Sequence, residues 1–76
     1  MIETQKIINR LRRSQKRLSK SHRKIAQLIE EHYDKTVYMT AQKMGEIAGV
    51  SESTVVRFAI ALGYEGYPQM QKALQE

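Results

Sequence analysis

The chain has 76 residues, a length that allows one domain, and 41% of them are hydrophobic, enough for one modest core. It has no cysteine, which excludes disulfides and thiolate metal sites and is typical of a reducing cytoplasm, the location we expect. The formal net charge is +5, and no apolar run approaches the roughly 20 residues that a membrane span needs.

The N-terminal segment, residues 1–17, carries most of the positive charge. Residues 1–24 contain nine Lys or Arg against one acid, whereas residues 25–76 contain four basic and seven acidic side chains. The pattern predicts an amphipathic helix with an apolar side and a basic ridge. The apolar side contains Ile7, Ile8, Leu11 and Leu18, and the ridge contains Lys6, Arg10, Arg13 and Arg17.

Each side of this predicted helix has two interpretations. The apolar side can dock on the chain's own domain or on the same helix of a second subunit, and the basic ridge can follow a phosphate backbone or remain a solvated surface. The candidate dimer contacts are Ile7, Ile8 and Leu11. The candidate phosphate contacts are Arg10, Arg13 and Arg17.

A second helix is predicted over residues 19–32. Ser19 is a suitable N-cap, and the core-facing positions are Ile25, Leu28 and Ile29. Residues 34–38 then form a short helical turn or loop, from which Val37 covers the core.

Residues 41–62 have the spacing of a helix-turn-helix. Thr40 is a plausible N-cap for the first helix, and Met39 can form a hydrophobic staple with Met44. Gly45 is expected where the two helices cross most closely, so that a side chain larger than alanine would push them apart. The residues of this helix expected to face the core are Met44, Ile47 and Ala48.

The turn of this motif centres on Gly49, which follows a short apolar run where a helix must end in a left-handed conformation. Val50 can fill the angle between the helices, and Ser51 is a suitable N-cap for the second helix. The buried stripe of that helix is predicted to contain Val55, Phe58, Ala59 and Leu62, and the outward stripe Ser53, Val56, Arg57 and Ile60.

The segment after the motif completes the fold. Gly63 ends the second helix, Tyr64 and Tyr67 fold back over the bundle, and Pro68 is expected as the first residue of a last helix that runs through Leu74. The sequence therefore predicts an all-α domain, a compact bundle of about five helices containing a helix-turn-helix.

Three segments carry a resemblance to a known family: LSKSHRKIAQLI at 18–29, GVSESTVVRF at 49–58 and LGYEGYPQM at 62–70. In this order and spacing they resemble the N-terminal domain of the MurR/RpiR family of transcriptional regulators. The resemblance implies binding to operator DNA and control by a phosphosugar that binds a C-terminal sugar-isomerase-like domain. The chain is too short for that second domain, so we expect it to be the N-terminal part of a longer protein. Family members often carry basic residues where this chain has Ile60, Ala61 and Glu65.

The outward stripe of the second helix provides the candidate DNA contacts. Arg57 can reach a guanine edge, although a surface ion pair is the alternative, and Val56 can touch a thymine methyl or help a neighbouring helix pack. Glu52 can accept from a cytosine amino group or only favour the helix dipole. The candidate base contacts are Glu52, Ser53, Val56 and Arg57, and the further candidate phosphate contacts are Gln42, Lys43, Ser51 and Thr54.

Enzymatic or metal chemistry has little support in the sequence. His22 and His32 are too far apart on one predicted helix to share a metal, and the adjacent Glu30 and Glu31 point about 100° apart. We expect no catalytic, metal or cofactor site. The predicted function is sequence-specific operator binding, with the full-length protein forming a homodimer or higher homo-oligomer. The alternative is a helical protein-interaction or dimerisation module without specific DNA binding.

Overall fold

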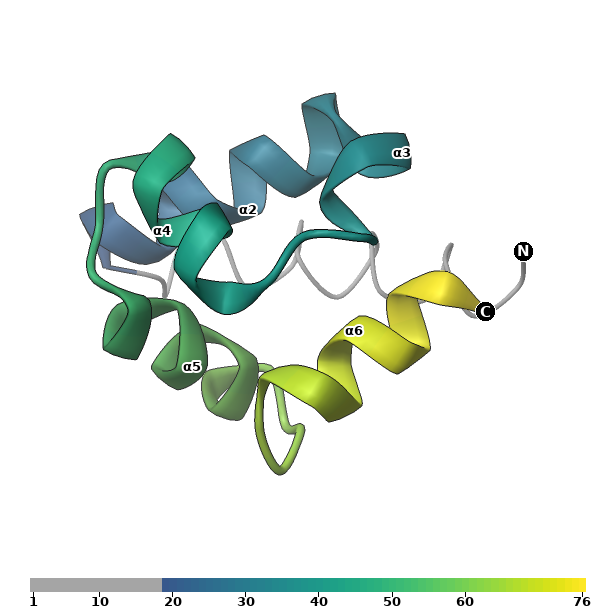
Figure 1. Ribbon diagram of the computed structural model, residues 1–76. Coiled ribbons are helices and arrows are strands. Elements are labelled where there is room, and N and C mark those ends of the chain that lie inside the picture. The colour runs from purple at the N-terminus through teal and green to yellow at the C-terminus, as the bar shows by residue number, and fades with distance from the viewer. Residues whose placement is uncertain (1–18) are drawn as a thin grey trace.

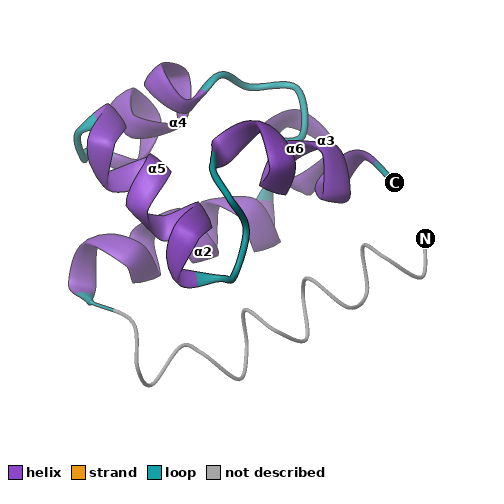
Figure 2. Cartoon of the chain, turned by 90° about the horizontal axis from the view of Figure 1, so that it is seen from below, coloured by secondary structure: helices purple, strands orange, loops and turns teal. Residues whose placement is uncertain are grey.

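The computed structural model describes residues 19–76, and within this range every regular element is a helix (Figure 2). The predicted all-α bundle of about five helices is therefore confirmed. The helix expected over residues 1–17 lies outside the described residues, as do the roles proposed for its side chains.

Two caps predicted from the sequence place the first long helix and the start of the helix-turn-helix. Helix α2 spans Lys20–Glu31, and its N-cap Ser19 accepts from the amide nitrogen of His22 at 3.3 Å. Helix α4 spans Ala41–Ala48, and its N-cap Thr40 accepts from the amide of Lys43 at 3.1 Å. Each hydroxyl satisfies one of the amides that a helix start leaves without an internal partner.

The remaining helices complete the bundle. Helix α3, Tyr33–Thr36, is the short helical turn expected after α2, and α5 spans Glu52–Ala61. The last helix, α6, spans Tyr67–Gln75, so it begins one residue before Pro68, which occupies the second helical position. Proline is tolerated there because an amide in the first helical turn has no intrahelical acceptor.

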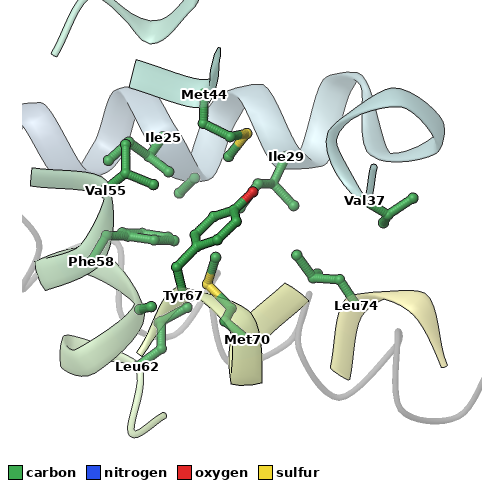
Figure 3. Close-up of a cluster of buried hydrophobic side chains, with 12 residues drawn as sticks. Ile25, Ile29, Val37, Met44, Val55, Phe58, Leu62, Tyr67, Met70 and Leu74 are labelled. Atoms are coloured by element: carbon green, nitrogen blue, oxygen red, sulfur yellow. The ribbon is translucent and has the colours of Figure 1, made fainter. Parts of the chain in front are cut away.

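The hydrophobic core lies between two groups of helices, with α2, α3 and α4 on one side and α5 and α6 on the other (Figure 1). The predicted buried stripe of α5 is confirmed, since its four residues are 0–5% exposed. The buried side chains that meet in the core come from every helix or its flanking turn (Figure 3). They include Ile25, Ile29, Val37, Met44, Val55, Phe58, Leu62, Tyr67, Met70 and Leu74.

Helix α6 is attached to the connection between α3 and α4 by side-chain hydrogen bonds. The Tyr67 hydroxyl donates to the Met39 carbonyl at 2.6 Å, and the Gln71 amide donates to the same oxygen at 2.8 Å. Gln75 donates to the Val37 carbonyl at 2.7 Å, and the Tyr33 hydroxyl donates to the carbonyl of Leu74. The bonds from Tyr67, Gln71 and Gln75 satisfy carbonyls of the connection that leads into α4, and the bond from Tyr33 satisfies a carbonyl of α6.

Candidate nucleic-acid interface

The turn between α4 and α5 is built on two glycines. Gly49 has φ 77° and ψ 32°, the left-handed conformation predicted for it, and Gly45 O accepts from the amides of Gly49 and Val50. A Cβ on Gly45 would lie 2.7 Å from the carbonyl oxygen of Val50. The close approach expected at Gly45 is therefore present, but its partner is the backbone of the turn, and it excludes even alanine.

The start of α5 carries a cluster of hydroxyl groups. Ser51 accepts from the amide of Thr54 at 3.2 Å, which confirms its role as N-cap. Its Oγ also lies 3.1 Å from Ser53 Oγ and 2.8 Å from Thr54 Oγ1. The exposed first turn thus combines orphan backbone amides, the positive end of the helix dipole and three linked hydroxyls, a surface suited to a phosphate.

The outward stripe of α5 has the predicted residues but not the predicted uniform exposure. Ser53, Arg57 and Ile60 are exposed, as expected, and Glu52 is exposed beside them. Val56 is half-buried and packs against the core, so only part of its side chain faces outward. Arg57 is therefore the exposed residue of this stripe whose long polar side chain can extend toward base edges, and it lies one helical turn from the hydroxyl cluster.

Helix α4 contributes a second exposed surface at its first turn. Gln42 and Lys43 are exposed in its first turn, and Lys43 Nζ lies 4.0 Å from Glu46 Oε2 with both side chains about 60% exposed. An ion pair with this exposure contributes little to stability, so the lysine can exchange its partner for a phosphate at small cost.

Ile47 corrects the sequence prediction for α4, because it is 48% exposed and does not face the core. The buried arc of the short helix runs through Met44, Gly45 and Ala48, and Ile47 lies roughly 60° outside it at 100° per residue. It borders a shallow hollow together with Leu28 and other residues of α2.

His22, for which the sequence indicates no metal site, is a neighbour of α5. Its ring packs edge-on against Phe58 of α5, with ring centroids 5.6 Å apart and planes at 82°. Partial burial and the nearby positive charge of Arg57 both lower the pKa of His22. No sequence signal identified this pair, because the contact joins two separate helices.

The structure thus brings together six of the predicted DNA-contacting residues on α5 and the adjoining turn. Gln42 and Lys43 lie on α4, while Arg10, Arg13 and Arg17 belong to the residues that are not described. The predicted residues on α5 and its cap are Ser51, Glu52, Ser53, Thr54, Val56 and Arg57.

Residues 19–76 contain no group of three or more His, Cys, Asp or Glu side chains placed to hold a metal ion. Over the same residues, no helix has the length and apolar composition to cross a membrane.

Comparison with known proteins places this geometry in a family. The chain is 37% identical over 67 residues to the uncharacterized HTH-type transcriptional regulator YfhH of Escherichia coli (strain K12), across 88% of the chain and 24% of the relative. It is 32% identical over 59 residues to the HTH-type transcriptional regulator HexR of Pseudomonas aeruginosa, across 78% of the chain and 21% of the relative. The chain thus spans a quarter or less of these relatives, and no solved structure matches it with statistical significance.

The model of the helix-turn-helix domain of the rpiR family matches residues 5–76, nearly the whole chain. With the cap, turn and outward helix described above, this match is specific, and the resemblance noted in the sequence is confirmed. The chain belongs to the RpiR family of helix-turn-helix domains, which are found in transcriptional regulators.

Proposed function

We propose that this domain binds operator DNA sequence-specifically by inserting α5 into the major groove. The observation that carries the proposal is the exposed Arg57 on the outward stripe of a helix that the Gly49 turn presents to solvent. A guanidinium there can donate two parallel hydrogen bonds to a guanine edge. The proposed base contacts are Glu52, Ser53, Val56 and Arg57.

Contacts to the phosphate backbone would flank this helix. The hydroxyls and first amides at the start of α5 suit one strand, through Ser51 and Thr54, and the exposed Gln42 and Lys43 of α4 suit a neighbouring phosphate. Residues 19–76 contain seven basic and seven acidic side chains, so the net positive charge comes from residues 1–18. We therefore assign further phosphate contacts to Arg10, Arg13 and Arg17.

Dimerisation is part of the proposal, because one helix offers few base contacts and two linked copies multiply their affinities. The apolar residues Ile7, Ile8 and Leu11 would supply contacts between subunits. If they do, changing Ile7 and Leu11 to serine reduces the molar mass measured by light scattering, whereas an unchanged mass would remove these residues from the interface.

The role proposed for the whole protein extends what the resemblance to the MurR/RpiR family implies. The chain spans a quarter or less of its curated relatives. We propose that the remainder of the protein binds a sugar or phosphosugar effector and that the regulator controls genes of its metabolism in the bacterial cytoplasm. Release of operator DNA by such an effector would be seen only with the full-length protein.

The test is fluorescence anisotropy with duplexes taken from the DNA upstream of the gene, across a salt series, with a scrambled duplex as competitor. Duplexes of about 30 base pairs hold two half-sites one or two helical turns apart. We expect preference for one upstream duplex and a steep loss of affinity with salt. Equal, weak binding to all duplexes would favour the protein-interaction module.

A variant pair sharpens this test. Arg57→Ala should weaken binding to the preferred duplex by about 1–3 kcal/mol and reduce the preference over the scrambled one. Lys72→Ala is the matched control, because Lys72 is an exposed cation on α6 outside the proposed interface. Equal loss in the two variants would show that Arg57 contributes only charge.

A further inference from the structure

The first turns of α2 lie next to α5 and carry positive but no negative side chains. Lys20, Arg23 and Lys24 are exposed, and the first acid on α2 is Glu30, in its last turn. Figure 1 shows the start of α2 at the same end of the molecule as the start of α5. The exposed basic residues of α2 therefore lie at the end of the molecule where α5 begins.

His22 connects the two helices. Phe58 is fully buried, while His22 is only half-buried, so the imidazole rests on the core through one edge and keeps part of its ring at the surface. Arg57 precedes Phe58 on α5, and its charge acts on the imidazole. An edge-on aromatic contact limits the orientations that the imidazole ring can adopt.

We propose that His22 is a further phosphate-contacting residue of the DNA interface, placed so that its imidazole meets the phosphate backbone beside the bases that Arg57 contacts. This inference rests on the proposed operator binding and adds a contact from a helix outside the helix-turn-helix. The ligand chemistry is a phosphodiester anion, which an imidazolium binds by a charge-assisted hydrogen bond.

The electrostatics make this contact dependent on pH. In the free protein, burial and then the positive charge of Arg57 lower the pKa of His22, so the neutral form of the ring predominates near pH 7. A phosphate beside the imidazole offsets the repulsion from Arg57, because the anion stabilises the imidazolium. The bound protein then holds more protons than the free protein, so affinity increases as pH falls through the range between the two pKa values.

Other charged groups near α2 do not account for the effect. Asp34 and Lys35 belong to α3, which follows the far end of α2, about 16 Å from His22 at 1.5 Å per residue. Lys43 and Glu46 of α4 pair with each other. Among the described residues packed against α2, Arg57 of α5 is thus the one whose charge lowers the pKa of His22.

The experiment measures binding of the chain to the preferred upstream duplex at constant ionic strength from about pH 8 to about pH 5.5, the range in which histidine titrates. Wild-type affinity should increase by on the order of three- to tenfold, since one pKa unit corresponds to about tenfold. His22→Gln should remove this increase. His32→Gln is the matched control and should retain it, because His32 is the exposed histidine at the other end of the same helix.

Two further measurements exclude a folding artefact. His22→Lys keeps a cation at all these pH values, so it should bind tightly without the increase. In the wild type, the imidazole C–H resonance of His22 should report a higher pKa with DNA bound than without it. The inference is overturned if His22→Gln keeps the wild-type pH dependence or if DNA leaves that pKa unchanged. If the wild type shows no preference for the upstream duplex and Arg57→Ala binds DNA as tightly as the wild type, the proposed operator binding itself is rejected instead.

Discussion

The carbonyl oxygen of Val50 lies 2.7 Å from the point that a Cβ on Gly45 would occupy, and the Gly45 carbonyl in turn accepts from the Val50 amide at 2.9 Å. The fourth-last residue of α4 and the turn are therefore in direct backbone contact. This contact determines how closely the turn follows α4 and hence where α5 begins.

Substitution of Gly45 by alanine should destabilise the domain by about 1–3 kcal/mol, the usual cost of overpacking, despite the higher helix propensity of alanine. The clashing atom belongs to the backbone and cannot rotate away. Urea unfolding followed by circular dichroism measures the effect. Gly66→Ala is the control, because there the nearest atom to a Cβ is the flexible Gln69 side chain at 3.3 Å and φ is −176°. A stable Gly45→Ala variant would show that the turn can move.

Substitutions at Ser51 should separate folding from DNA binding. Asparagine and aspartate both cap helices as well as serine, so Ser51→Asn and Ser51→Asp should each change stability by less than about 0.5 kcal/mol, whereas Ser51→Ala should cost about 1 kcal/mol. The aspartate adds a negative charge where we propose a phosphate. Anisotropy should therefore show weaker DNA binding for aspartate than for asparagine, and equal binding would place the phosphate elsewhere.

Loss of the apolar side chain should affect stability far less at Ile47 than at Met44. Ile47→Gln should change the free energy of unfolding by no more than about 0.5 kcal/mol, because the side chain is 48% exposed. Met44→Ala should cost about 2–5 kcal/mol, because Met44 is fully buried. Thermal and urea unfolding compare the two. A large loss for Ile47→Gln would mean that its surface is covered in solution.

Tyr67 should make stability depend on alkaline pH. Burial raises the pKa of Tyr67 to about 12, against about 10 for an unperturbed tyrosine. Between these values the unfolded chain releases the proton first and the folded chain retains it, so the free energy of unfolding decreases as pH rises.

Tyr67→Phe has no phenolic proton to release. Its free energy of unfolding should therefore lack the part of the alkaline decrease that Tyr67 causes. At neutral pH the variant should lose about 1 kcal/mol with the hydrogen bond to Met39, whose carbonyl keeps its bond from Gln71. The stability gap between wild type and variant should therefore narrow in urea unfolding near pH 11. A constant gap would show that Tyr67 titrates alike in both states.

The local signals in the sequence were sufficient for the helices and the turn. Ser19, Thr40 and Ser51 cap as predicted, and Gly49 adopts the left-handed conformation, because each acts on amides or dihedrals within a few residues of itself. The buried stripe of α5 was equally predictable, since helical periodicity alone identifies the apolar face of a helix. The same motifs led to the correct family.

Only the tertiary structure decided the features that depend on distant neighbours. Ile47 has a helical position close to the core arc, and its exposure follows from where α2 and α5 lie around a short helix. The His22 contact with Phe58 and the bonds from α6 to the α3–α4 connection join residues far apart along the chain. A sequence records which side chains can bury or bond, but helix packing selects their partners, because packing depends on the summed shape of all the helices.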